Sequence, residues 1–446
     1  MRNASLYSLT AEICGRVLSD ARPADALIAK YFRERTFLGS HDRRFISDSM
    51  YALIRHKRRL EAIAAIANEN ITNPPINGPL ALLGAFVATH PTDRPVDLVV
   101  AMAEAAQCEM QAADQFVVAC TNAVVDSQDA TTAERIAIQL SYPDWLVNRI
   151  IAERGEEEAE QLCAAMNIQA PITIRVNELT TSVPSCADAL LKDGTPTLRG
   201  LISSTALRLQ KRVNIFQTPV FKLGWFEMQD EGSQTIALFA DPHPTWKILD
   251  ACAGAGGKTL HFAALMKNKG EIFALVQNEF QDAELRRRLR RASAQNVRVV
   301  NGTNPETIKK MAGTMNIVLI DAPCSGTGTI RRNPIAKWRL SEDKITGYVQ
   351  EQKNILMQYK DAVRPQGKLV YATCSILKEE NAEVAAWFLA NNPEFALDTR
   401  GTRFATPAGV KFADDPTMRT PEGYLELLPH RNDTDGFFAA AFTRTV

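Results

Sequence analysis

Two cysteines lie where the chain could support covalent chemistry. Cys324 follows the apolar run NIVLI within the segment DAPCSGTG, and Cys374 follows KLVYAT. A cysteine thiolate is a strong nucleophile, and nearby positive charge or a helix N-terminus lowers the pKa of a thiol. A single cysteine in such a place is more often a small buried side chain. Two of them, each in a polar turn directly after an expected strand, favour a nucleophilic site.

A glycine-rich turn is the second candidate feature. The sequence ILDACAGAGGKT at 248–259 predicts a strand, a turn and a helix that begins near Thr259. The glycines of the turn would let backbone amides approach a ligand closely. A Walker A loop is excluded because Cys252 occupies the position of its first glycine, and the GxGxxG pattern does not fit either. The turn is therefore a cofactor loop of another kind or simply a tight connection.

Two basic segments are candidates for contact with nucleic acid. Arg331, Arg332, Lys337 and Arg339 surround Trp338, and basic residues beside an aromatic ring suit phosphate contact and base stacking. A solvated charged face is the alternative interpretation of such a run. The expected helix 282–294 carries five arginines within six positions, which cannot all share one helix face. Some of them must be exposed, and others are expected to meet RNA or acidic neighbours.

The elements that would position these residues fall into three parts. Residues 1–140 show helical periodicity, clearest over 42–65, and predict an all-helical domain. Residues 141–226 mix short helices and strands and predict a small α+β module. Residues 227–446 alternate strands with helices, which predicts a doubly wound, mostly parallel α/β sheet. Such a sheet binds its ligands at the carboxyl ends of its strands, where both cysteines are expected.

Composition narrows the class of protein. The 446 residues are 46% hydrophobic and 23% charged, which is typical of a soluble globular protein with two or three domains. The 51 basic and 51 acidic residues cancel, so net charge neither requires nor excludes a nucleic-acid partner. The eight cysteines form no CxxC pair and the six histidines show no metal-ligand spacing, so we expect no metal site and a reducing, cytoplasmic location. The longest apolar stretch, 79–88, is about half of a membrane span, and no exposed apolar heptad is visible. We expect no membrane association and a monomer.

The three motifs together resemble those of a known family. The segments DACAGAGGKT, DAPCSGTGTIRRNP and YATCS match, in order and spacing, the RsmB/Nop/Sun family of RNA 5-methylcytosine methyltransferases, and ITIRVN, MQDEGSQ and TDGFFAAAF match its flanking segments. The chain is similar over its whole length to bacterial members that act on 16S ribosomal RNA and carry a NusB-like RNA-binding domain. The resemblance implies a Rossmann-like class I methyltransferase sheet, S-adenosylmethionine as cofactor, and ribosomal RNA or a small-subunit assembly intermediate as substrate.

The resemblance also implies roles for individual residues. Cys374 would add to carbon 6 of an unstacked cytosine, Cys324 would assist the later elimination of Cys374, and Asp321 would hydrogen-bond the edge of the base. The residues expected to hold the cofactor are Cys252, Ala253, Gly254, Ala255, Gly256, Gly257, Lys258, Glu279 and Asp321.

The sequence departs from the family around the ribose of the cofactor. Val276 and Thr303 occupy positions where family members have acidic residues, Ala255 replaces a common proline, and Glu279 is the acid nearest to Val276. One hypothesis is an active cytosine-5 methyltransferase of ribosomal RNA. The alternative is a non-catalytic RNA-binding or ribosome-assembly protein whose cofactor pocket has decayed. The same chemistry on transfer RNA is a third possibility, which the helical N-terminal domain disfavours.

Overall fold

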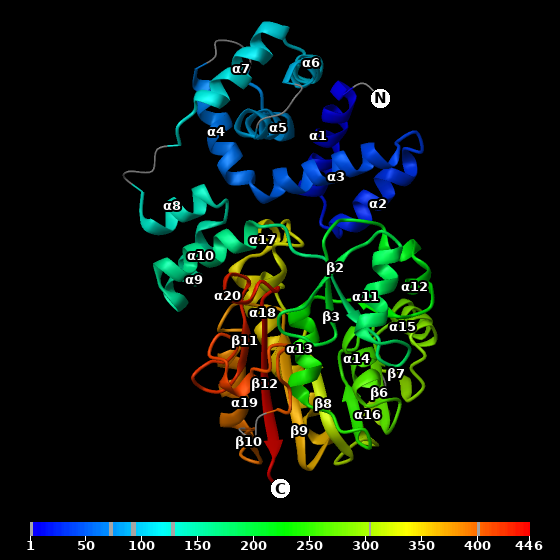
Figure 1. The fold of residues 1–446 in the computed structure, drawn as a ribbon. Coiled ribbons are helices and arrows are strands. Elements are labelled where there is room, and N and C mark those ends of the chain that lie inside the picture. The colour runs from blue at the N-terminus through cyan, green and yellow to red at the C-terminus, as the bar shows by residue number, and fades with distance from the viewer. Residues whose placement is uncertain (1–2, 71–74, 91–94, 126–129, 303–304, 399–401) are drawn as a thin grey trace. The chain divides into compact units, whose positions relative to one another are not determined.

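The chain forms two compact units in a computed structural model (Figure 1). The structure describes residues 3–70, 75–90, 95–125, 130–302, 305–398 and 402–446. The first unit contains residues 1–167 and a short later segment, 333–340; the second contains 168–332 and 341–446. The expected boundary near residue 140 therefore differs from the boundary between the units, which falls after Asn167.

The first unit is entirely helical over its described residues, as the sequence predicts. Its helices are α1 (Asn3–Ser19), α2 (Ala24–Glu34), α3 (Ser40–Arg55), α4 (Lys57–Glu69), α5 (Gly78–Thr89), α6 (Pro95–Ala106), α7 (Met110–Asn122), α8 (Thr132–Gln139), α9 (Asp144–Arg154), α10 (Glu156–Asn167) and α17 (Ala336–Arg339). One apolar core, which includes Ile46, Leu53 and Phe116, joins most of them.

The segment 42–65 is helical, as its periodicity predicts, but the structure divides it at His56 into α3 and α4. The hydroxyl of Ser141 accepts hydrogen bonds from the backbone N–H groups of Arg58 at 2.7 Å and Arg59 at 3.4 Å. A distant side chain thus satisfies donors that the first turn of a helix leaves without an intrahelical partner. The periodicity of the sequence runs through this point, so only the tertiary contact reveals the break.

The second unit holds two sheets. The small antiparallel sheet has the order β2-β3-β1-β4 and the large one has the order β10-β12-β9-β8-β5-β6-β7, with β11 paired to β12. The strands of the second unit are β1 (Thr173–Val176), β2 (Thr197–Arg199), β3 (Ala206–Leu209), β4 (Phe226–Met228), β5 (Lys247–Asp250), β6 (Glu271–Val276), β7 (Val297–Asn301), β8 (Met315–Asp321), β9 (Val363–Thr373), β10 (Phe395–Leu397), β11 (Leu425–Leu427) and β12 (Phe437–Arg444). Its helices are α11 (Val183–Lys192), α12 (Pro219–Lys222), α13 (Glu231–Ala240), α14 (Gly257–Leu265), α15 (Glu279–Arg291), α16 (Pro305–Lys309), α18 (Glu342–Tyr359), α19 (Ala382–Asn391) and α20 (Pro429–Asn432).

The central strands of the large sheet are parallel, which confirms the doubly wound, mostly parallel prediction. β5 pairs in parallel with β6 and β8, β6 with β7, and β8 with β9, whereas β12 runs antiparallel to β9. The connections between the parallel strands pass through helices, which cover both faces of the sheet.

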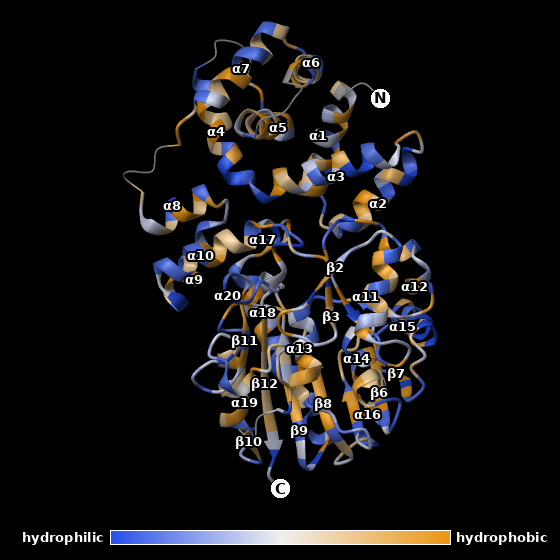
Figure 2. Cartoon of the chain, in the orientation of Figure 1, coloured by the Kyte–Doolittle hydropathy of each residue, from blue (hydrophilic) through white to orange (hydrophobic). Residues whose placement is uncertain are grey.

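Alternating side chains divide the interior of this unit into two cores. Ile317 and Leu319 of β8 face one core, which includes residues of α13 and α14, while Val318 and Ile320 face a second core that includes residues of α18 and α19. Figure 2 shows these strands as the apolar centre of the unit. A strand buried on both faces reads as a continuous apolar run, which is why NIVLI was identifiable as a strand. The sheet thereby fixes the point at which β8 and β9 end, side by side.

Candidate active site

The two cysteines lie in contact at the ends of neighbouring parallel strands. Asp321, the last residue of β8, pairs in register with Ala372 of β9, so the loops that carry Cys324 and Cys374 start at the same sheet edge. The two Sγ atoms are 3.3 Å apart. The structure therefore brings together the two thiols that the sequence singled out.

Gly328 makes the close approach of the two loops possible. Its N–H donates to the carbonyl oxygen of Cys374 at 2.9 Å. A Cβ at this position would lie 2.8 Å from that oxygen and 2.3 Å from the carbonyl oxygen of Gly436. No side chain fits there without displacing backbone, so the glycine is required by packing.

A buried ion pair stands beside the cysteines. Lys258, the second residue of α14, places its Nζ 2.5 Å from Oδ2 of Asp321, and the two side chains are 9% and 31% exposed. Burial alone would lower the pKa of Lys258, but the charge and hydrogen bond of Asp321, with smaller contributions from Cys374 and Asp250, raise it above its usual value. Lys258 therefore stays an ammonium ion at neutral pH and supplies positive charge to the site.

The electrostatic surroundings of Cys324 favour its neutral form. The hydrogen bond with Cys374 and burial, followed by the charges of Cys374 and Glu380, raise the pKa of the Cys324 thiol well above its ordinary value. The thiol of Cys324 thus remains protonated at neutral pH, so it is suited to donate a proton rather than to attack. The other thiol, Cys374, is close enough to Lys258 for the two groups to interact electrostatically.

A cavity of about 610 Å³ opens at the same sheet edge. Apolar side chains of Leu275, Ile355 and Tyr359 line it together with the polar side chains of Gln277, Gln281, Asp321 and Glu351; its other lining residues are Ala251, Cys252, Gly254, Gly302, Ala322, Pro323 and Gln358. The volume lies within the range of small-molecule and cofactor sites. Apolar walls with a few polar groups suit a ligand that combines a flat ring with hydroxyl and charged groups, so the donor set fits an adenosyl cofactor.

The predicted cofactor residues divide into three that line the cavity and six that do not. Cys252, Gly254 and Asp321 line it. Lys258 acts through Asp321, and the remaining loop residues serve the turn itself: at Gly256, with φ of 85°, a Cβ would lie 2.2 Å from Leu285. Glu279 starts α15 and is exposed, outside the residues that line the cavity, so the structure gives it no role there.

The position expected to carry a ribose-binding acid is filled differently. Val276 is 4% exposed and packs in an apolar cluster with Leu285 and Leu289 of α15. The next residue, Gln277, lines the cavity, and its backbone N–H donates to Oε1 of Gln281 at 2.8 Å. Thr303 lies outside the described residues.

The sequence analysis missed the wall of the cavity that α18 contributes, including Glu351. The spacing of Glu351, Ile355 and Tyr359 at every fourth position could have indicated one helix face.

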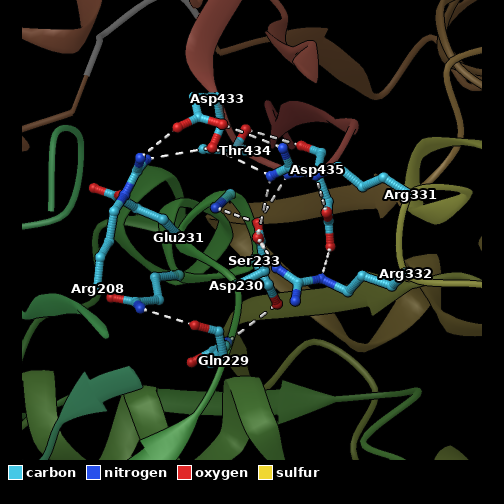
Figure 3. Close-up of polar contacts among 12 residues, drawn as sticks. Arg208, Gln229, Asp230, Glu231, Ser233, Arg331, Arg332, Asp433, Thr434 and Asp435 are labelled. Atoms are coloured by element: carbon cyan, nitrogen blue, oxygen red, sulfur yellow. Dashed lines mark hydrogen bonds and ion pairs between the residues drawn. The ribbon is translucent and has the colours of Figure 1, made fainter. Parts of the chain in front are cut away.

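The proposed nucleic-acid role of Arg331 and Arg332 is not supported, because both lie in an ion-pair network (Figure 3). Arg331 is 2% exposed and its Nε donates to Oδ1 of Asp435 at 2.7 Å. Arg332 pairs with Asp435 and, at 2.6 Å, with Asp230 at the N-terminus of α13. These arginines join the loop after Cys324 to the start of β12 and to α13 rather than presenting free charge.

The rest of the basic segment is also buried or bonded, here within the helical unit. Lys337 is fully buried, and its Nζ donates to the carbonyl oxygen of Arg55 at 2.8 Å. Trp338 donates to the carbonyl oxygen of Ile54, and Arg339 donates to carbonyl oxygens at the end of α1 and after it. The interpretation of this segment as an RNA contact is therefore wrong.

The arginines of α15 meet acidic neighbours, as one of the two sequence interpretations expected. Arg288 and Arg291 pair with the buried Glu227 at 2.9 and 2.5 Å. Arg286 and Arg287 form exposed ion pairs within the helix.

Comparisons with known proteins identify the class. A family model described as 16S rRNA methyltransferase RsmB/F matches residues 237–443, and a model of the RsmF/B-like ferredoxin-like domain matches 142–216. Crystal structures similar to the chain include that of PH0851, with a TM-score of 0.77, 26% identity and 98% of each chain covered. A methyltransferase homolog from Pyrococcus horikoshii has a TM-score of 0.59 and 27% identity, covering 71% of this chain and 99% of its own. The fold is that of a methyltransferase.

Curated relatives narrow the class to a family. The chain is 32% identical to the probable ribosomal RNA small subunit methyltransferase B of Bacillus subtilis, over 70% of this chain and 68% of the relative. It is 29% identical to the probable ribosomal RNA small subunit methyltransferase B of Synechocystis, over 90% of this chain and 91% of the relative. The chain belongs to the RsmB/Nop/Sun family of methyltransferases. No helix among the described residues is both long and apolar enough to span a bilayer.

Proposed function

We propose that the chain is a methyltransferase that uses S-adenosylmethionine to make 5-methylcytosine in ribosomal RNA of the small subunit. The observation that carries the proposal is the contact of Cys324 and Cys374, 3.3 Å apart, at the sheet edge that also holds Asp321 and the large cavity. The family and the names of the curated relatives support the ribosomal substrate. The helical unit is proposed to contact RNA as a NusB-like domain.

Carbon 5 of cytosine is a weak nucleophile, and the two thiols address this difficulty in turn. When bound, the cofactor supplies an electrophilic methyl group. The thiolate of Cys374 adds to carbon 6 and converts the ring to an enamine, so that carbon 5 can accept the methyl group. Solvent accepts the proton of carbon 5, the electron pair of that C–H bond restores the ring double bond, and the bond between carbon 6 and Sγ breaks so that Cys374 leaves as a thiolate. Cys324, in contact with Cys374, assists this elimination.

Two observations support this division of roles. Lys258 is close enough to Cys374 for the two to interact electrostatically, whereas the hydrogen bond with Cys374, burial and the charge of Glu380 raise the pKa of the Cys324 thiol. Asp321, which lines the cavity and is held by Lys258, is the residue proposed to bind the edge of the base. Cys252, Gly254, Gln277, Gln281 and Glu351 are the residues proposed to hold the cofactor.

Single-cysteine variants test the proposal directly. With 16S ribosomal RNA or a small-subunit assembly intermediate as substrate, Cys374→Ala is expected to abolish methyl transfer. Cys324→Ala is expected to accumulate a covalent protein–RNA adduct visible on a denaturing gel. Full activity and no adduct in both variants would contradict the proposal. If calorimetric titration shows no affinity for S-adenosylmethionine with RNA absent or present, the non-catalytic alternative is supported instead.

A further inference from the structure

The loops that carry the two thiols share one buried carboxylate. Glu380 lies between β9 and α19 and is fully buried. Its Oε1 accepts from the backbone N–H of Ser325 at 2.8 Å, and its Oε2 accepts from the hydroxyls of Ser325 and Ser375, each at 2.5 Å. Ser325 directly follows Cys324, and Ser375 directly follows Cys374. One carboxylate therefore bridges the residues next to both thiols.

Four hydrogen bonds hold the carboxyl group of Glu380 in place. A fourth hydrogen bond comes from Nε2 of Gln352 at 3.1 Å, so all four donors are neutral, and none of the described lysine or arginine side chains donates to it. An ionised carboxylate accepts through both oxygens and cannot donate. A buried polar group without hydrogen-bond partners is costly, so these four partners hold the carboxyl group in one position.

The same carboxylate reaches the wall of the cavity. Gln352 also donates to the carbonyl oxygen of Pro323 at 3.0 Å, one residue before Cys324. On α18, Gln352 lies between Glu351 and Ile355, which line the cavity. Glu380 thus connects the Cys324 loop, the Cys374 loop and the helix that forms one side of the proposed cofactor site.

We propose that Glu380 is a positioning residue that holds Cys324 against Cys374 and places a carboxyl group beside the Cys324 thiol. The roles of the two thiols in this inference rest on the proposed function. The positioning of the two loops by Glu380 rests on the hydrogen bonds alone. The charge of Glu380 is one of the causes that raise the pKa of Cys324. A neutral residue of the same shape would remove that charge and place an amide donor against the N–H and hydroxyl donors of the two serines.

The test compares Glu380→Gln with the matched control Glu383→Gln, an exposed acid three residues later. The first measurement is the rate of Cys324 alkylation by iodoacetamide as a function of pH, in a Cys374→Ser background. Glu380→Gln is expected to move the midpoint of this profile to lower pH by about one unit, a tenfold change in thiol acidity, whereas Glu383→Gln leaves it in place. A residue with a merely structural role would not shift the profile in this direction.

The second measurement is the single-turnover rate of adduct formation with the native pair of cysteines. A displacement of about 1 Å between reacting groups costs on the order of 100-fold, so a loss of about this size is expected for Glu380→Gln, with unchanged affinity for S-adenosylmethionine. An unshifted alkylation profile together with a wild-type adduct rate would overturn the inference. Because alkylation needs neither cofactor nor RNA, an inactive wild-type protein would refute the proposed function without deciding the role of Glu380.

Discussion

Nζ of Lys258 lies 2.5 Å from Oδ2 of Asp321, and the pair joins the first turn of α14 to the end of β8. The aspartate proposed to bind the base is thereby fixed by a lysine from the glycine-rich turn. This contact connects two of the motifs found in the sequence, the cofactor turn and the Cys324 loop, through a single ion pair.

Removal of the lysine charge should impair catalysis more than binding. Lys258→Met leaves Asp321 without its partner and takes away positive charge near Cys374, so we expect the single-turnover methylation rate to fall by about 100-fold or more. Lys269→Met, an exposed position after α14, is the control and should keep the wild-type rate. The rates are measured at saturating S-adenosylmethionine and RNA. Equal rates for the two variants would show that the ion pair is dispensable.

Mild oxidation should link the two active-site thiols. All eight cysteines are free, and the Sγ atoms of Cys324 and Cys374 are already in contact. Diamide is expected to convert this pair to a disulfide, which lowers the intact mass by about two hydrogen atoms, blocks methyl transfer and is reversed by dithiothreitol. Cys324→Ser should prevent the mass change. A disulfide between other cysteines, or retained activity after oxidation, would contradict the expectation.

Glu351 and Glu279 make opposite predictions for cofactor binding. Glu351 lines the cavity, whereas Glu279 does not. Glu351→Gln is therefore expected to weaken S-adenosylmethionine binding about tenfold, which corresponds to ~1.4 kcal/mol, and Glu279→Gln to leave the dissociation constant unchanged. Calorimetric titration of both variants decides the matter. A larger loss of affinity in Glu279→Gln than in Glu351→Gln would instead support Glu279, the acid that the sequence suggested, as a cofactor-binding residue.

A buried acid at the end of β5 should make stability depend on pH. Burial raises the pKa of Asp250 to about 6, even though Thr259 donates to it at 2.6 Å. Between the unfolded pKa of about 3.9 and this value, the folded chain binds the extra proton, so stability falls as pH rises and the change is complete above pH 6.

Asp250→Asn removes this proton uptake. The stability of the wild type relative to this variant, measured by urea unfolding, is expected to fall by about 2 kcal/mol between pH 3.9 and 6. Asp343→Asn, at an exposed position in the first turn of α18, should show no comparable change. A difference that stays constant across this range would show that Asp250 is not protonated in the folded chain.

The sequence predicted the positions that follow directly from strand ends. Once the apolar runs before Asp321 and Cys374 are read as parallel neighbours, their loops must meet, and the structure places the thiols in contact. The fate of Lys337 could not be predicted in the same way. Its partners are the carbonyl oxygen of Arg55 and the side chain of Asn167, which belong to helices far away in sequence. Charge patterns show which residues need partners, but they do not show where those partners are.

The segment 333–340 has a consequence for the synthesis of the chain. It completes the helical unit, and Ile335 belongs to the core of that unit, yet it is translated only after the whole stretch 168–332. At ~5–20 residues per second, the ribosome needs roughly 10–30 s to add that stretch. During this interval the nascent helical unit lacks Ile335 and Lys337, so its final packing must wait for a piece of chain that emerges with the middle of the methyltransferase sequence. Assembly of the two units is thus interleaved in time, and a polypeptide ending at Asn167 would be released with its own interior unfinished.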